Sequence, residues 1–173
     1  MKKKLLVLLM LVLLVVQAGC GGVSIDGNGN SGVVGHDPSK LFTEEEAEKV
    51  LGFDVEQDVQ KMDESGQKLV YYGATSDDEK VFIQVSVARD EDMSDNLKQS
   101  GFNVGKLFEQ IKQDFPDKQD VEGFGKEAFW ANGALHILEE GVYVSISTGT
   151  PDDAKNLDRA KEIANTVMSR LEI

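Results

Sequence analysis

The sequence predicts an α+β fold: an antiparallel sheet of about six to seven strands with about three helices packed on it. Three observations predict it. Apolar residues recur at helical spacing in three segments, apolar and polar residues alternate in several others, and short turn-forming stretches join most of these segments. Two-residue turns join antiparallel strands, whereas parallel strands need a crossover of a dozen or more residues. The regular patterning starts at residue 38, and we expect one domain over residues 38–173.

The first predicted helix begins after Thr43. Thr43 is a typical N-cap residue, and Glu46 three positions later completes a capping box. Gly52 is a plausible helix end, because glycine tolerates the left-handed conformation that closes many helices. The apolar face of this helix consists of Ala47, Val50 and Leu51.

Three strand-like segments follow, at residues 55–62, 67–75 and 80–89. The connections at 63–66 and 76–79 consist of turn-forming residues. The third segment alternates most clearly, which predicts a strand with two different faces. One face carries Val81, Ile83, Val85 and Val87, and the other carries Phe82, Gln84, Ser86 and Ala88.

A second helix is predicted over residues 103–115, after a charged break at residues 90–95. Pro116 ends it, because proline cannot continue a helix. The apolar residues at helical spacing are Val104, Leu107, Phe108 and Ile111.

The second half of the domain contains three or four further strands. Asn132-Gly133 is a strong signal for a two-residue hairpin turn. In the last strand Val142, Val144 and Ile146 alternate with Tyr143, Ser145 and Ser147. The strand candidates lie near residues 119–122, 127–131, 134–139 and 142–148.

A third helix follows, with Thr150 as its N-cap and Pro151 at its first position. The order of elements indicates two similar halves, each a helix followed by three strands, without a convincing residue-level repeat. The apolar face of the last helix consists of Leu157, Ala160, Ala164, Val167, Met168 and Leu171.

Composition excludes several classes of function. The chain has 173 residues, with 18 Lys and Arg against 31 Asp and Glu, and a formal net charge of −13. Nucleic-acid binding needs a basic surface, so we expect no nucleic-acid partner. The single cysteine rules out an intrachain disulfide and any Cys-rich zinc or iron–sulfur site.

The first 19 residues have the layout of a secretory signal peptide. Three lysines at positions 2–4 precede an unbroken apolar run at residues 5–16. These twelve residues are too few for a membrane span, which needs about 20. Small residues at positions 18 and 19 then lead into Cys20.

Ala18-Gly19-Cys20 resembles the lipobox of bacterial lipoproteins, although Gln17 stands where that motif usually has an apolar residue. The resemblance implies that Cys20 takes a diacylglycerol and becomes the new N-terminus, on the extracytoplasmic face of the cell membrane. Two acyl chains are also what stable anchoring requires. Removal of residues 1–19 makes the chain more acidic still, so any charged partner is expected to be cationic.

Residues 20–37 form a Gly-rich tether between the lipidated cysteine and the domain. Oxygen-bearing side chains here imitate the spacing of a calcium loop. Ser31 occupies the position where such a loop needs glycine, and no amphipathic helix precedes it, so the sequence predicts neither a metal site nor a cofactor. The residues with this spacing are Asp26, Asn28, Asn30 and Asp37.

Catalytic machinery is not evident in the sequence. His36 lies in the tether, and His136 lies in a strand without a nucleophile motif beside it. Gly123 and Gly125 lack the rest of a phosphate-binding fingerprint and indicate a bend into a hairpin. We therefore expect a non-enzymatic protein that binds a ligand or protein partner. An envelope hydrolase that uses His136, or a structural subunit of an envelope complex, is the alternative.

Three segments also look like a loose group of small, uncharacterised bacterial lipoproteins similar to the sensor-like extracellular domains of Gram-positive bacteria. The segments are residues 43–52, residues 123–130, and residues 135–138 leading into 142–147. The resemblance covers most of residues 41–171. It implies an α+β fold without known enzymatic activity, and it supplies no catalytic residues.

The best candidate for a binding site is the mixed face of the two clearest strands. Aromatic rings beside hydroxyls and an amide make an adaptable recognition surface. His136 joins this face if its strand pairs with residues 142–148. The hypothesis requires an open face; an ordinary solvated sheet face is the alternative. The candidate residues are Phe82, Gln84, Ser86, His136, Tyr143 and Ser145.

Overall fold

A computed structural model describes residues 37–62, 65–74, 82–149 and 154–171 of the chain. The predicted signal peptide, the lipidation site Cys20 and almost all of the tether lie outside the described residues, as do Val81, Thr150 and Pro151. The helices are α2 (Pro38–Leu41), α3 (Glu44–Leu51), α4 (Asp95–Gln99), α5 (Val104–Asp114) and α6 (Asn156–Arg170). The strands are β1 (Val55–Met62), β2 (Gln67–Ala74), β3 (Phe82–Arg89), β4 (Gln119–Asp120), β5 (Glu127–Ala131), β6 (Ala134–Glu139) and β7 (Val142–Thr148).

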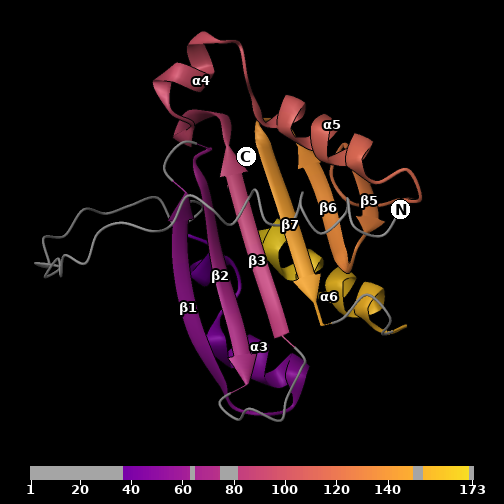
Figure 1. Ribbon diagram of the computed structural model, residues 1–173. Coiled ribbons are helices and arrows are strands. Elements are labelled where there is room, and N and C mark those ends of the chain that lie inside the picture. The colour runs from indigo at the N-terminus through magenta and orange to yellow at the C-terminus, as the bar shows by residue number, and fades with distance from the viewer. Residues whose placement is uncertain (1–36, 63–64, 75–81, 150–153, 172–173) are drawn as a thin grey trace, which may run out of the picture. The chain divides into compact units, whose positions relative to one another are not determined.

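All seven strands belong to one antiparallel sheet, in the order β1-β2-β3-β7-β6-β5-β4 (Figure 1). The predicted α+β class and strand number are therefore confirmed. After β3 the chain crosses to the far edge of the sheet through α4 and α5. It then returns strand by strand until β7 pairs with β3 at the centre of the sheet.

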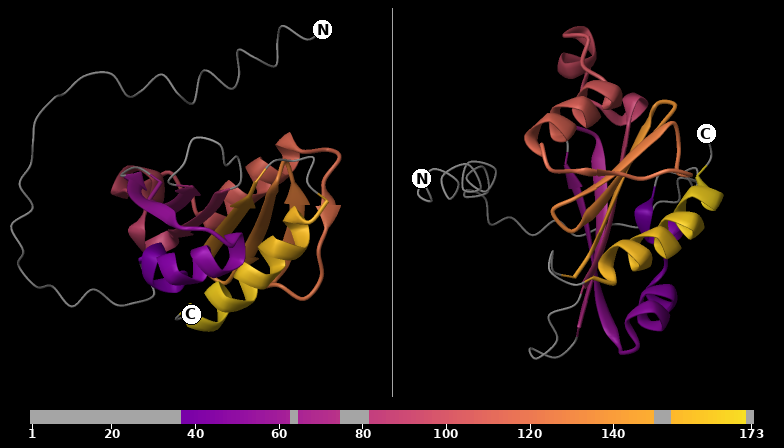
Figure 2. Two further views of the ribbon diagram at one scale, coloured as in Figure 1. Left: turned by 90° about the horizontal axis from the view of Figure 1, so that it is seen from below. Right: turned by 90° about the vertical axis from the view of Figure 1, so that its right-hand side faces the viewer.

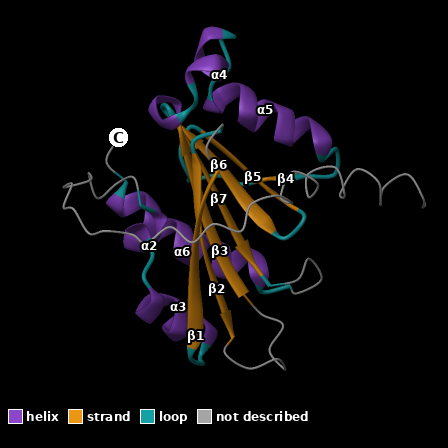
Figure 3. Ribbon diagram, turned by 60° about the vertical axis from the view of Figure 1, so that its left-hand side comes forward, coloured by secondary structure: helices purple, strands orange, loops and turns teal. Residues whose placement is uncertain are grey.

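Helices cover both faces of this sheet (Figures 2 and 3). The face packed against α2, α3 and α6, called the α6 face, contains the larger core. Its strand residues include Val70, Tyr72, Ile83, Val85, Leu135, Ile137, Val144 and Ile146. The face packed against α5, called the α5 face, contains a second core built around Phe108, Phe129 and Tyr143.

The two predicted halves are not equivalent. The first half has three strands and the second has four, and α3 and α5 lie on opposite faces of the sheet. The pseudo-repeat is therefore not confirmed. The second half also differs in detail, because β4 covers only residues 119–120 and α6 begins at Asn156, with no side-chain cap from Lys155.

Local signals account for several of the observed boundaries. Thr43 caps α3, and its capping box with Glu46 is confirmed. Gly52 ends α3 with a left-handed φ of 83°. At the turn between β5 and β6, Asn132 and Gly133 both have positive φ, as the two-residue hairpin requires. Asn103 caps α5 by accepting a hydrogen bond from the Lys106 backbone N–H.

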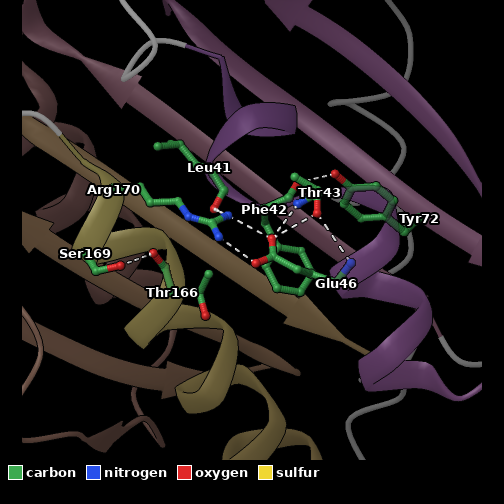
Figure 4. A network of polar contacts seen from close by, with 8 residues as sticks. All are labelled: Leu41, Phe42, Thr43, Glu46, Tyr72, Thr166, Ser169 and Arg170. Carbon is green, nitrogen blue, oxygen red and sulfur yellow. Dashed lines mark hydrogen bonds and ion pairs between the residues drawn. The ribbon is translucent and has the colours of Figure 1, made fainter.

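A polar network ties α6 to the start of the domain (Figure 4). The Glu46 carboxylate accepts hydrogen bonds from the Thr43 backbone at 2.9 Å and from the Arg170 guanidinium at 2.6 and 2.8 Å. Arg170 also donates to the Leu41 carbonyl, and the Tyr72 hydroxyl donates to the Phe42 carbonyl. The hydrogen bond from Arg170 is the main reason why the pKa of Glu46 falls to about 2. These contacts fix α2 and α3 against α6. All of them lie on the α6 face of the sheet.

Candidate functional site

The six candidate residues do lie on one face of the sheet, the α5 face. Strand register decides this, because directly paired residues of an antiparallel sheet point to the same side. Gln84 pairs with Ser147, Ser86 pairs with Ser145, and Ser145 pairs in turn with His136. Tyr143 follows at the next same-face position of β7. The sequence therefore placed these side chains on the correct side of their strands.

Helix α5 divides this face into a covered half and an open half. It lies over the strands β5, β6 and β7, where Phe108 contacts both Phe129 and Tyr143 at ring-centroid distances of 5.2 and 6.1 Å. Tyr143 is only 2% exposed. The expectation that Tyr143 is an accessible recognition residue is wrong, because α5 buries its ring in the core.

His136 belongs to the covered half as well, with 7% of its surface exposed. Its ring stacks on Phe129 at 4.6 Å, and its Nδ1 lies 2.7 Å from the Tyr143 hydroxyl. Burial disfavours the charged imidazolium and lowers the pKa of His136 to about 4, although a hydrogen bond with the Ala131 backbone opposes this shift. Burial also raises the pKa of Tyr143. His136 is therefore a neutral ring of the core and not an accessible base.

The two candidate serines are also buried. Ser145 is buried and its side chain hydrogen-bonds Tyr143, and Ser86 accepts a hydrogen bond of 2.6 Å from the Gln67 side chain. Among the six candidates, only Phe82 and Gln84 remain partly exposed. The predicted site is therefore reduced to the part of the α5 face that lies over β1, β2 and β3.

This open half of the α5 face carries an aromatic pair that sequence reasoning missed. Tyr71 is 37% exposed, and its ring stacks on Phe82 with centroids 5.4 Å apart and planes 26° apart. No side chain of the open half belongs to either core cluster. The open half is defined by Glu56, Asp58, Gln60, Leu69, Tyr71, Phe82 and Gln84.

Gly73 explains how Tyr71 reaches Phe82. Gly73 pairs with Phe82 across β2 and β3, and a side chain at this glycine would begin 2.6 Å from the Tyr71 ring. The tyrosine ring therefore lies flat over a strand position that has no side chain of its own. Tyr71 and Gly73 are two positions apart in the sequence and therefore lie on the same face of β2. A glycine in a strand often marks a close approach by another group, so this spacing, with Phe82 on the neighbouring strand, was the sequence signal for the aromatic pair.

The charged side chains of the open half are acidic. Glu56 and Asp58 are exposed on β1, and Asp58 pairs directly with Tyr71. Lys61 and Lys68 occupy alternate positions of β1 and β2 and so belong to the other face. Among the described residues, the open half thus combines stacked rings with carboxylates and contains no cationic side chain.

Two hollows adjoin α5: one runs along the helix from Asn103 to Gln113, and the other lies at its start beside Asp90 and Lys126. They have volumes of about 440 and 490 Å³ and share Asn103, Gly105 and Leu138 in their walls. Their charged lining residues are Lys106 and Glu109 in the first hollow and Asp90, Lys126, Glu139 and Glu140 in the second. The carboxylate of Asp90, which lines the second hollow, accepts a hydrogen bond of 2.6 Å from the Val104 backbone N–H. Neither His136 nor Tyr143 lines either of these two hollows.

The described residues show neither a metal-binding cluster nor a membrane-spanning helix. That part of the chain holds no group of three or more His, Cys, Asp or Glu side chains placed to bind a metal ion. Within the same ranges, none of the helices has the length and apolar character of a membrane span. The lipidation prediction for Cys20 falls outside the described residues.

No protein-family model matches the chain, and neither the curated proteins nor the solved structures contain a significant match.

Proposed function

We propose that this chain is an extracytoplasmic lipoprotein, anchored in the cell membrane through Cys20, whose domain binds a protein or ligand and catalyses no reaction. The sequence supports the anchor: a positively charged start and an apolar run at residues 5–16 are followed by Gln17, Ala18 and Gly19 and then by the only cysteine. A binding domain on a lipid tether meets its partners at the membrane surface.

The observation that carries the binding function is the stacked pair Tyr71 and Phe82 on the open half of the α5 face. Aromatic rings give a large contact area at low entropic cost, and they are enriched where proteins recognise partners. Both rings are carried by paired strands, Tyr71 within β2 and Phe82 at the start of β3, so their backbone positions are already set before binding. The alternative of an envelope hydrolase has less support, because its one candidate base, His136, is buried and neutral.

The partner's chemistry follows from the neighbours of these rings. Glu56 and Asp58 lie on the same half, and the whole chain has a formal net charge of −13. A cationic group can pair with these carboxylates and lie over an aromatic face at the same time, a contact worth about 0.5–2 kcal/mol. We therefore expect a basic partner.

The anchor is tested by replacing the cysteine. Cys20→Ser should leave unprocessed precursor or release the protein from the membrane fraction. Intact-mass measurement should find a diacylglycerol-sized addition on the wild-type chain, and an unmodified thiol at Cys20 would overturn the anchor.

The binding face is tested by photocross-linking in intact cells. A cross-linking amino acid at Gln84, on the open half, should give a discrete adduct that Tyr71→Ala abolishes. The matched control is the same cross-linker at Gln113, an exposed position of α5. Equal adduct patterns from both positions would show that the open half is not a binding face.

A further inference from the structure

We infer that the free edge of β1 accepts an extended, basic segment of the partner as an eighth strand; this inference rests on the proposed function and names how the partner is held. The described residues place β1 at one end of the sheet, paired with β2 alone. The outer edge of such a strand presents backbone N–H and C=O groups that another chain can use.

The geometry of β1 suits strand addition. The strand spans eight residues, contains no proline, and pairs with β2 in an unbroken register from Val55 to Met62. Sheets usually protect long edges with bulges, prolines, charged side chains or very short strands, and of these devices β1 has only charged side chains, namely Glu56, Asp58 and Lys61. The opposite edge follows that rule, since β4 has only two residues. The edge at β1 is therefore the one that leaves room for a partner strand.

Exposure along β1 points the same way. Every side chain from Glu56 to Lys61 is exposed, and Val59 is 50% exposed although it is apolar. Val59 lies on the α6 face, directly across from the buried Val70. An added strand would place its own side chain beside Val59 and remove this apolar surface from water.

Charge selects the kind of segment. On the α5 face β1 carries Glu56, Asp58 and Gln60, and the Gln60 side chain donates a hydrogen bond of 2.7 Å to Asp58. Lysine or arginine residues at alternate positions of an added strand would face these carboxylates. The side chain opposite Asp58 would also reach the ring of Tyr71, the next residue across the sheet.

A second copy of this chain fits the edge less well than a basic segment. Pairing β1 with β1 of another copy would gather Glu56 and Asp58 of both copies on one face, between two domains that are each acidic. Like charges on neighbouring strands oppose pairing. A segment that alternates basic and β-branched residues provides the complementary pattern instead.

The test uses the full chain in detergent micelles and a synthetic peptide of alternating lysine and valine. Binding is measured by titration calorimetry, and backbone hydrogen exchange reports where the peptide lies. We expect slowed exchange in β1 and little change in β6. A peptide of the same sequence with N-methylated amides keeps the charge but cannot extend a sheet, so it should bind at least about tenfold more weakly.

Matched charge variants separate strand addition from general attraction. Asp58→Lys should weaken peptide binding about tenfold, whereas Asp117→Lys, which makes the same charge change at an exposed loop position, should have a small effect. Equal binding of the N-methylated peptide, or equal effects of both variants, would overturn the inference. In the absence of peptide, backbone exchange in β1 that slows further as the protein concentration rises would also overturn the inference. That result would indicate that a second copy of the chain pairs with β1.

Failure of this inference can be told apart from failure of the proposed function. Peptide binding that depends on Tyr71 but not on Asp58 or on peptide amides contradicts strand addition and leaves the aromatic site in place. Strand addition without a cross-link from Gln84 in cells contradicts the proposed function at that face.

Discussion

Arg170 in the last turn of α6 binds both carboxylate oxygens of Glu46, which stands 124 residues earlier in the chain. Two parallel N–H···O bonds between a guanidinium and a carboxylate give strong geometric specificity. Because Glu46 also closes the capping box of α3, one carboxylate serves a local helix end and a contact between the two ends of the domain. The pair thus couples the formation of α3 to the docking of α6.

Glu46→Gln should lower the free energy of unfolding by about 1 kcal/mol at neutral pH, a value discounted because both side chains are partly exposed. The folded-state pKa of Glu46 is about 2, below the ordinary value of 4.5. Stability from the ionised carboxylate is therefore present above pH 4.5 and lost as the pH falls towards 2. Urea unfolding of both proteins should show their difference shrinking over that window; a constant difference would contradict the assignment.

Burial of His136 should make the protein less stable in mild acid. The unfolded chain takes up a proton near pH 6.5, whereas the folded state does so only near pH 4. Between these values the unfolded state binds more protons, so the free energy of unfolding falls as the pH drops, by about 3 kcal/mol at most. His136→Gln should show a flatter dependence over the same range, and the difference in slope between the two proteins isolates this histidine from the acids.

Tyr143 should behave as a core residue in a stability measurement. Tyr143→Ala removes a ring packed under α5 and should cost about 3–5 kcal/mol, while Tyr143→Phe keeps the ring and should cost about 1 kcal/mol through the lost contact with His136. The matched control is Tyr71→Ala on the open half, which should cost clearly less. Similar losses for Tyr143→Ala and Tyr71→Ala in thermal or urea unfolding would place Tyr143 outside the core.

Alanine substitutions at Gly66 and Gly52 compare a glycine that is packed against the Asp92 backbone with one that is not. Both have positive φ, 65° and 83°, so alanine is strained at either position by about 1–2 kcal/mol. At Gly52 a new Cβ meets no atom within 4 Å, whereas at Gly66 it would lie 2.3 Å from the Asp92 backbone. Gly66→Ala should therefore destabilise the protein well beyond Gly52→Ala. Equal losses would mean that the backbone at Asp92 moves aside freely.

Much of this fold could be predicted because its signals are local. The capping box at Thr43, the hairpin at Asn132-Gly133 and the alternation in β3 and β7 depend on neighbouring residues, and each appears in the structure. The short helices α2 and α4 were missed, since one turn of helix is too short to show a period. Helix α4 also follows a charged segment, which in the sequence indicates a break between elements.

The candidate site was predicted only in part because its accessibility is a tertiary property. Alternation correctly put Tyr143 and Val142 on opposite faces, but it cannot tell that both faces of β7 are covered. That outcome depends on the crossover from β3 to the far edge, which lays α5 over β5, β6 and β7. As a result of the same crossover, none of the described helices lies over Tyr71 and Phe82, and no pattern within β2 or β3 reveals this.

The central pairing of β3 with β7 also sets the order in which the chain can fold. Strands β1 to β3 form one meander of neighbouring strands, and β4 to β7 form another, but the seam between them joins residues on either side of two helices and three strands. Contacts between such distant residues slow folding, because a long loop must close before they form. Until β7 has been synthesised, β3 is a free edge strand that carries the apolar residues Val85 and Val87. A chain that ends before Val142 therefore leaves β3 as an unpaired, apolar edge strand, and it should aggregate where the full chain folds.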